Sequence, residues 1–453
     1  MKDFNTVYCR KAKFTIRAQR RIQFIINRYS VWKIFIFSLK ESVCKLYLKE
    51  SHEINLSKMA NKEIEIFREF LRIPSVHPNI NYDSCVQFLK KQAESLNLPL
   101  KVNFAGDPTK PIVVITFEGS QPELSSIMLN CHMDVVPVDE DKWVHPPFSA
   151  HMDEEGRIFA RGSQDMKCLG TQYLAVIREL QKSGTKLKRT LHLTFVPDEE
   201  IGGKFGMQAF VHTTAFKDLN IGFAIDEGTP EEDDVYKVYF AERTMWHIHF
   251  HINGTAGHGS RLLENTAAEK AKYLINKFSE LRAREAKKLI DNPDFTDGDV
   301  TSINLTRLDG GVQTNVIPSK ISLGYDIRIA LEVDIPEFEK EIQKWCEEAG
   351  GDIEIVFEIK EPVTERTKLD NTNIYWTAFK QGLESMKLKH KARVMAGGTD
   401  IQYLRALNIP AIGFSPIINT PVLLHDHNEF LTAEMYLLGI KIWKEILMEV
   451  ANV

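Results

Sequence analysis

Residues 126–134, SIMLNCHMD, set the expected fold class, because a short apolar run ends there in an imidazole and a carboxylate. Three other runs have the same apolar character, at 112–117, 191–196 and 222–225. An amphipathic helix is expected at about 166–181, between the second and third runs in chain order. Continuous apolar strands that alternate with helices are typical of a buried, mainly parallel sheet. The sequence therefore predicts an α/β fold.

The pattern changes near residue 238 and predicts an inserted α+β unit. Its expected order is strand 244–252, helix 264–288, strand 301–308, strand 320–329, helix 336–348 and strand 352–359. This β-α-β-β-α-β order is that of a ferredoxin-like unit. We therefore expect a discontinuous main domain, residues 59–238 and 361–453, with an insert at 239–360.

Composition describes an ordinary globular protein of two or three domains, with 453 residues, 43% hydrophobic residues and a net charge of −5. The most apolar stretch, 22–39, is interrupted by Arg28 and Lys33, which argues against a membrane span. The six cysteines form no CxxC pair, which favours a reducing, intracellular setting over a disulfide framework. An acidic body argues against a nucleic-acid partner.

The first 58 residues differ from the rest because they are basic. No acidic residue occurs between Arg10 and Lys40, a composition typical of an organelle transit peptide. Two alternatives remain: an extension with no part in the chemistry, or translation that begins at Met59. We expect a cytoplasmic protein, with mitochondrial targeting as the alternative.

Acidic residues and histidines follow the predicted strands. In an open α/β sheet, ligands bind beyond the carboxyl ends of the strands. The residues found there, or beside a helix start, are His132, Asp134, Asp165, Asp198, Glu199, Glu200, Asp226, Glu227 and, late in the chain, His425. Singly, each has a plain alternative as a surface loop, a solvated charge run or a helix cap. Their common position after strands favours one shared site.

Two imidazoles and at least three carboxylates, without a thiolate, suit Zn²⁺, Mn²⁺ or Co²⁺. One zinc ion normally takes three protein ligands, so five ligands indicate two ions that share a carboxylate. Such a pair activates water for hydrolysis, and a nearby free carboxylate is needed to move the proton.

Nine stretches carry a family resemblance: CHMDVVPV at 131–138, WVHPPFSA at 143–150, ARGSQDMK at 160–167, TFVPDEEIGG at 194–203, AIDEG at 224–228, GTAGHGSR at 254–261, NVIP at 315–318, GGTD at 397–400 and TPVLLHDHNEF at 420–430. In this order they resemble the co-catalytic two-zinc family of aminoacylases, dipeptidases and carboxypeptidases, and its aminoacylases most of all. The resemblance runs from about Glu63 to the C-terminus.

The resemblance implies two zinc ions per subunit. By position, His132, Asp165 and Asp226 bind one ion, and Asp165, Glu200 and His425 bind the other, with Asp165 as the bridge.

The resemblance also assigns proton-transfer and orienting roles. It implies that Glu199 is the general base and then the general acid. Asp134 resembles the carboxylate that orients the imidazole of His132.

Three residues of the insert match positions that act on the substrate. His258 corresponds to a histidine that reaches the active site of the partner subunit and stabilises the oxyanion, although a histidine in a Gly-rich turn is more often structural. Asn315 and Arg328 correspond to substrate contacts, and for Arg328 a cross-strand salt bridge is the alternative. The resemblance thus implies a homodimer formed through the insert.

The GGTD turn matches part of the family's substrate pocket, which makes Gly398, Thr399 and Asp400 candidate binding residues, and its alternative is a plain loop before a helix. Gln402 stands where close aminoacylases tend to carry arginine, although Arg405 remains.

The leading hypothesis is a zinc amidohydrolase that converts N-acyl-L-amino acids to a carboxylate and a free amino acid. A dipeptidase or related exopeptidase on the same site is the alternative among enzymes. A catalytically silent scaffold predicts a missing ligand or base, and none is missing. Neither GxxxxGK[ST] nor GxGxxG after a strand occurs, which argues against a nucleotide-dependent enzyme.

Overall fold

The computed structural model describes residues 60–363 and 365–453, so the expectations for the basic extension at 1–58 lie outside the described residues. Residues 64–71 are helical, and Phe67, Phe70 and Leu71 are fully buried. In the described part of the chain, no helix combines the length and the apolar character needed to cross a membrane.

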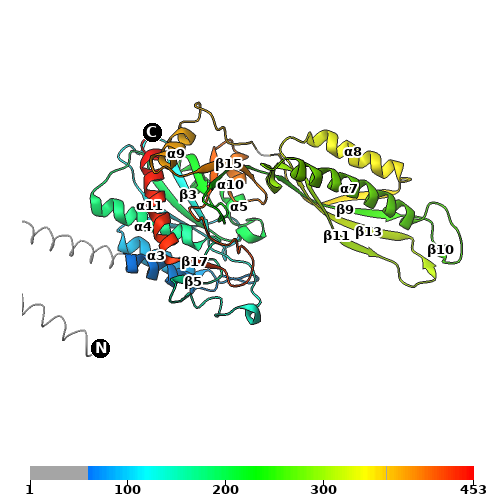
Figure 1. Cartoon of the computed structure of the whole chain (residues 1–453), viewed down its shortest axis with the longest axis horizontal. Helices are drawn as coiled ribbons and strands as arrows, with labels where there is room; N and C mark the ends of the chain where they lie inside the picture. The colour runs from blue at the N-terminus through cyan, green and yellow to red at the C-terminus, as the bar shows by residue number, and fades with distance from the viewer. Residues whose placement is uncertain (1–59, 364) are drawn as a thin grey trace, which may run out of the picture. The chain divides into compact units, whose positions relative to one another are not determined.

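The larger sheet has eight strands and carries the candidate site (Figure 1). From edge to edge its strands are β1 (Leu100–Phe104), β2 (Pro111–Phe117), β6 (Leu191–Val196), β3 (Ser126–His132), β7 (Ile221–Asp226), β16 (Ala411–Phe414), β8 (Tyr236–Glu242) and β15 (His390–Met395). The predicted apolar runs are therefore strands of one sheet, and the α/β fold class is confirmed.

The sheet is mixed, whereas the sequence predicted a mainly parallel one. Its centre, β6-β3-β7-β16, is parallel, but β1 with β2, β2 with β6, and β16 with β8 are antiparallel. The short turn at 105–110 joins β1 to β2, and a connection of that length permits only an antiparallel pair.

Helices cover both faces of this sheet. Residues at alternate positions of its strands point to opposite faces and pack with the helices in two separate clusters. One face packs against α3 (Asp83–Ser95), α4 (Lys167–Ser183), α9 (Ile374–Ser385) and α11 (Ala433–Val450). The other packs against α5 (Met207–Phe210), α6 (Thr214–Lys217) and α10 (Ile401–Arg405). In β2, for example, Val113 and Ile115 belong to the first cluster, and Ile112 and Val114 to the second.

A second sheet lies between β8 and α9 in the chain. It is fully antiparallel, in the order β11 (Ser302–Gly310), β13 (Lys320–Ile329), β9 (Thr244–Asn253) and β14 (Ile353–Lys360). Helices α7 (Ala267–Asp291) and α8 (Ile335–Glu348) cover one face, as Figure 1 shows. Every second residue of β9 is buried, which matches one packed face and one open face.

Short elements complete the fold. A three-stranded sheet contains β4 (His151–Met152), β5 (Arg157–Phe159) and β17 (Phe430–Thr432), and a two-stranded ladder contains β10 (Gly257–His258) and β12 (Val316–Ile317). Single 3-10 turns occur at η1 (Glu140–Lys142), η2 (Glu199–Ile201) and η3 (Asp297–Asp299).

Gly170 allows α4 to pack closely on the strands that carry the candidate ligands. A Cβ atom at this position would lie 2.6 Å from Phe195 Cε1 and 2.7 Å from Cys131 Sγ. Phe195 belongs to β6 and Cys131 to β3, and both are fully buried. The close approach of helix and sheet therefore requires glycine here.

We expect Gly170→Val to destabilise the protein by about 1–3 kcal/mol, because the added methyl groups overpack the contact between α4 and the sheet. Denaturant unfolding followed by circular dichroism measures this. Gly397→Val is the matched control, since no atom lies within 4 Å of a Cβ placed at Gly397. Equal unfolding midpoints for the two variants would contradict the close-packing argument.

Candidate metal centre

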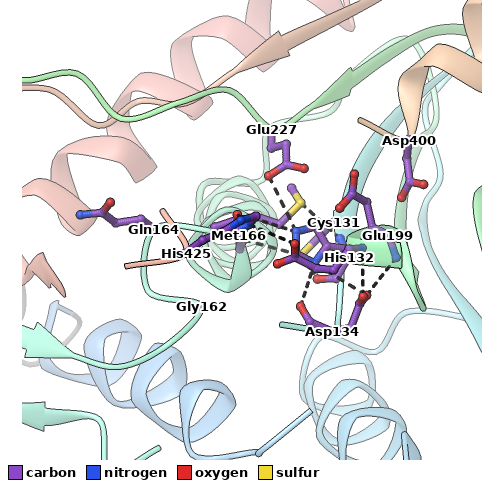
Figure 2. A network of polar contacts seen from close by, with 12 residues as sticks. Cys131, His132, Asp134, Gly162, Gln164, Met166, Glu199, Glu227, Asp400 and His425 are labelled. Carbon is purple, nitrogen blue, oxygen red and sulfur yellow. Dashed lines mark hydrogen bonds and ion pairs between the residues drawn. The ribbon is translucent and has the colours of Figure 1, made fainter. Parts of the chain in front are cut away.

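The candidate ligands lie where the central strands of the larger sheet end. β3 ends at His132, β6 leads into the turn that contains Glu199 and Glu200, and β7 ends at Asp226, with Glu227 next. Because β6, β3 and β7 are parallel, these three ends share one edge of the sheet. Figure 2 shows Glu199 and Glu227 close to His132.

Two segments far apart in the sequence bring the remaining candidates to this edge. Asp165 lies two residues before α4, and His425 lies in the loop before β17. Glu429, which is fully buried, holds the segment around Asp165. Its carboxylate accepts hydrogen bonds from the backbone N–H groups of Gly162 (3.1 Å), Gln164 (2.6 Å) and Asp165 (3.3 Å), and from the guanidinium of Arg161 (2.8 Å).

His132, Asp165 and Glu227 form the first possible ligand group. The Nε2 atom of His132 lies 2.8 Å from Asp165 Oδ1 and 3.7 Å from Glu227 Oε2. One ligand atom from each residue lies within 4.8 Å of the other two. These are donor types that bind zinc and similar divalent ions.

Asp165, Glu200 and His425 form the second possible ligand group, and Asp165 belongs to both. The Nε2 atom of His425 lies 3.3 Å from Asp165 Oδ2 and 3.0 Å from Glu200 Oε2. The three ligand atoms again lie within 4.8 Å of one another. A carboxylate shared by two ligand groups is the arrangement expected of a two-metal site.

Asp226 belongs to neither of the two possible ligand groups, although the resemblance implied that it is a ligand. Successive side chains of a strand point to opposite faces, and at the end of β7 it is Glu227 that turns to His132. The Asp226 carboxylate accepts hydrogen bonds from Asn130 Nδ2 (3.2 Å) and from the Glu227 backbone N–H (2.9 Å). Sequence reasoning noted both acids after the strand, and strand alternation was the signal that could separate them.

Asp134 supports His132 through its backbone rather than through its carboxylate. The Nδ1–H of His132 donates to the Asp134 carbonyl oxygen at 2.8 Å, whereas the Asp134 carboxylate lies 3.8 Å from Nδ1. This bond leaves Nε2 as the metal-facing nitrogen. The Asp134 carboxylate instead accepts hydrogen bonds from the backbone N–H groups of Glu199 (3.2 Å) and Glu200 (3.1 Å).

Glu199 belongs to neither ligand group, although Figure 2 shows it close to His132 of the first group. Burial, followed by the nearby carboxylates of Glu227 and Asp400, raises its pKa well above the usual value. A carboxyl group with a raised pKa can both accept and return a proton near neutral pH.

The candidate residues of the insert lie apart from these groups. His258 is exposed and bonds to Ser260 Oγ through Nδ1 (2.8 Å), and its strand β10 pairs with β12, directly after Asn315. Arg328 forms a salt bridge with Asp326 (2.8 Å), which lies two residues away on the same strand and not across strands. Among the described residues, no hydrogen bond or ion pair joins His258, Asn315 or Arg328 to the ligand groups.

The GGTD turn is held mainly by contacts with buried residues elsewhere in the chain. Thr399 and Asp400 are buried; Thr399 Oγ1 donates to Glu242 (2.6 Å), and Asp400 accepts from Asn130 (3.2 Å). Arg405 is fully buried in an ion pair with Glu242 (3.1 Å), so its guanidinium is already paired within the fold. Of the predicted turn residues, Gly398 is exposed.

The donor set fits divalent metal ions, because several carboxylates are crowded together. Burial, and then the charge of Asp165, raises the pKa of both Glu200 and Glu227. Hydrogen bonds to Asp165 and Glu200 raise the pKa of His425 to about 10. Burial alone lowers the pKa of His132, but Glu227 and Asp165 outweigh it and raise the pKa well above 6.5. Bound cations would balance these negative charges directly.

We expect metal binding to release protons at neutral pH, since His425, whose pKa is about 10, must be neutral as a ligand, and Glu200 and Glu227, whose pKa values are raised, must be ionised. The apparent metal affinity therefore falls as the pH is lowered. Calorimetric titration in buffers of different ionisation enthalpy measures the release. His425→Gln should release one proton fewer, whereas a variant of the distant His212, such as His212→Gln, should match the unsubstituted chain. Binding without proton release would contradict the assignment.

Comparison with known proteins gives the same family that the sequence motifs suggested. The family model "Peptidase family M20/M25/M40" matches residues 128–449. Aminoacylase-1A of Rattus norvegicus is 44% identical and human aminoacylase-1 is 43% identical, each over 391 residues that make up 86% of this chain and 95% of the relative.

Solved structures of low sequence identity share the fold. An M20 family metallo-carboxypeptidase from Sulfolobus solfataricus superposes with a TM-score of 0.68 at 19% identity, covering 86% of this chain and 99% of its own. A dinuclear metal-binding peptidase of the M20 family from Bacillus subtilis gives 0.65 at 14% identity, covering 86% and 98%. With its motifs, its family model and its close relatives in agreement, this chain belongs to peptidase family M20/M25/M40.

Proposed function

We propose that the protein is a metal-dependent amidohydrolase that cleaves N-acyl-L-amino acids to a carboxylate and a free L-amino acid. The observation that carries this proposal is the pair of ligand groups that share Asp165, with Glu199 unliganded beside them. Identity above 40% to aminoacylases along most of the chain supports the substrate class. We further propose a cytoplasmic location, as the cysteine pattern suggests.

Two zinc ions per subunit are proposed as the cofactor. His132, Asp165 and Glu227 would hold one ion, and Asp165, Glu200 and His425 the other. When bound, such ions polarise the amide carbonyl and lower the pKa of water. The chain's own contribution is to fix the ligands: Glu429 holds the segment of Asp165, and the Asp134 carbonyl fixes the ring of His132.

Glu199 is proposed to move the proton. It takes a proton from the attacking water and then donates it to the nitrogen of the leaving amino acid. Its raised pKa favours holding the proton between the two steps, because burial and the neighbouring carboxylates stabilise the protonated form.

Residues 239–360 are proposed to form a ferredoxin-like unit through which two chains pair, with 59–238 and 361–453 as the catalytic domain. The edge strand β11 supports pairing, since Asn304 to Gly310 are all exposed and include Leu305 and Leu308. An exposed, partly apolar edge is a ready surface for a second chain. His258 is then proposed to stabilise the oxyanion in the partner's site, with Asn315, Arg328 and Gly398 as substrate contacts.

We expect Glu199→Gln to lower kcat by about 10²–10⁴-fold while the metal content stays near that of the unsubstituted protein, because the proton transfer is lost and the ligands remain. Steady-state kinetics on N-acetylmethionine, with metal analysis of the same samples, test this. Substantial residual turnover would remove Glu199 from the proposed role. A strong preference of the unsubstituted protein for a dipeptide over N-acetylmethionine would favour the alternative, a dipeptidase.

Mixing two inactive variants tests the exchange of His258 between subunits. A hybrid of Glu199→Gln and His258→Ala chains has one site with an intact Glu199 and an intact partner histidine. After co-expression we expect about a quarter of the original activity, because half of randomly formed dimers are hybrids with one good site. Mixtures that stay as inactive as the separate variants would contradict a role across the dimer. His251→Ala in place of His258→Ala is the matched control on the same insert.

A further inference from the structure

A buried polar cluster lies behind the turn that carries Glu199 and Glu200. It contains His77, Tyr82, Lys110, Asp134 and Asp198, and of these only Asp134 and Asp198 were among the candidate residues of the sequence. His77 belongs to the segment before α3, far in sequence from every other candidate residue.

Asp134 is the centre of this cluster. Its side chain is fully buried, and Oδ1 accepts the Glu199 N–H, while Oδ2 accepts the Glu200 N–H at 3.1 Å and faces His77 Nε2 at 2.8 Å. The orientation of this carboxylate therefore sets the position of the turn that carries the proposed base and a proposed ligand. Figure 2 shows Asp134 with its dashed contacts to the neighbouring residues drawn there, among which His132 and Glu199 are labelled.

His77 is held in place by backbone contacts, so that its ring is presented to Asp134. The N–H of His77 donates to the Val135 carbonyl (3.2 Å), Val135 N–H donates to Ser75 (2.8 Å), and Val76 bridges to Val135. The side chain of His77 is only 9% exposed. Its imidazole is the one side chain among the described residues that donates to the Asp134 carboxylate.

The same cluster has the residue types of a metal site, since ligand atoms of His77, Asp134 and Asp198 lie within 4.8 Å of one another. Protein donors already occupy these acceptors, however. Asp198 bonds to Tyr82 Oη (2.7 Å) and to the ammonium of Lys110 (2.8 Å), and Asp134 bonds to two backbone amides. A fixed lysine charge here disfavours a cation, so the cluster is a hydrogen-bonded support.

We propose that His77 is a positioning residue for the reaction, acting through Asp134 on the turn of Glu199 and Glu200. The hydrogen bond from Nε2 fixes the carboxylate that in turn holds the two backbone amides. This inference rests on the proposed function of Glu199 and deepens it. Loss of the donor leaves Asp134 Oδ2 with one partner fewer in a buried place, and the turn loses part of its support.

Three variants of His77 separate positioning from mere packing. We expect His77→Leu, which fills the space without a donor, to lower kcat on N-acetylmethionine about 10- to 100-fold, with KM within about twofold and metal content unchanged. His77→Gln, whose amide can donate from a similar position, should restore most of the loss. His192→Leu is the matched control, because His192 is 8% exposed and bonds to Thr116 (3.0 Å) outside the cluster.

Hydrogen exchange of the Glu199 and Glu200 amides gives a readout that needs no turnover. His77→Leu should exchange faster at these two amides than the unsubstituted protein, and His77→Gln should not. Unchanged exchange at these amides, or a His77→Leu enzyme with normal kcat, overturns the inference. A folded, metal-loaded His77→Gln variant that does not regain kcat overturns it as well. If the unsubstituted protein is inactive on every substrate, but the Glu199 and Glu200 amides of the His77 variants exchange as expected, the proposed function alone is refuted.

Discussion

The carboxylate of Asp165 is the point at which the two halves of the candidate centre meet. His132 contacts one of its oxygens and His425 the other, although the two histidines are separated by almost three hundred residues of chain. Those hydrogen bonds hold the pKa of Asp165 well below its usual range, against the effect of burial. Every other ligand is arranged around this residue, which is why the segment before α4 is bonded so extensively to Glu429.

The charge of the site explains its surroundings. Several carboxylates gather at one sheet edge, where burial and the charges of neighbouring carboxylates raise the pKa of Glu199, Glu200 and Glu227. Such crowding is unfavourable in a buried place unless cations or fixed donors compensate it. Asn130 provides part of this compensation below the site, because its amide donates to both Asp226 and Asp400 while its oxygen accepts from Thr194. Asp226 and Asp400, two buried acids outside the ligand groups, are thus structural partners of one amide.

Sequence reasoning succeeded where the chemistry depends on strand position. The apolar runs predicted the strands, and the rule that ligands follow strand ends led to His132 and Glu200, which the structure places in the two ligand groups. It did not separate Asp226 from Glu227, because adjacent acids after a strand point in opposite directions and only Glu227 faces His132. The support by His77 was out of reach, since a single contact between segments 57 residues apart leaves no local pattern.

The bonds of Glu429 also determine when the centre can form during synthesis. The loop of Asp165 receives its anchor, and its second imidazole, from a segment close to the C-terminal helix α11. A nascent chain that has already produced β3, β6 and β7 therefore lacks both a ligand and the residue that orders the shared carboxylate. The complete pair of ligand groups can therefore assemble only after the chain has been synthesised as far as the segment before α11.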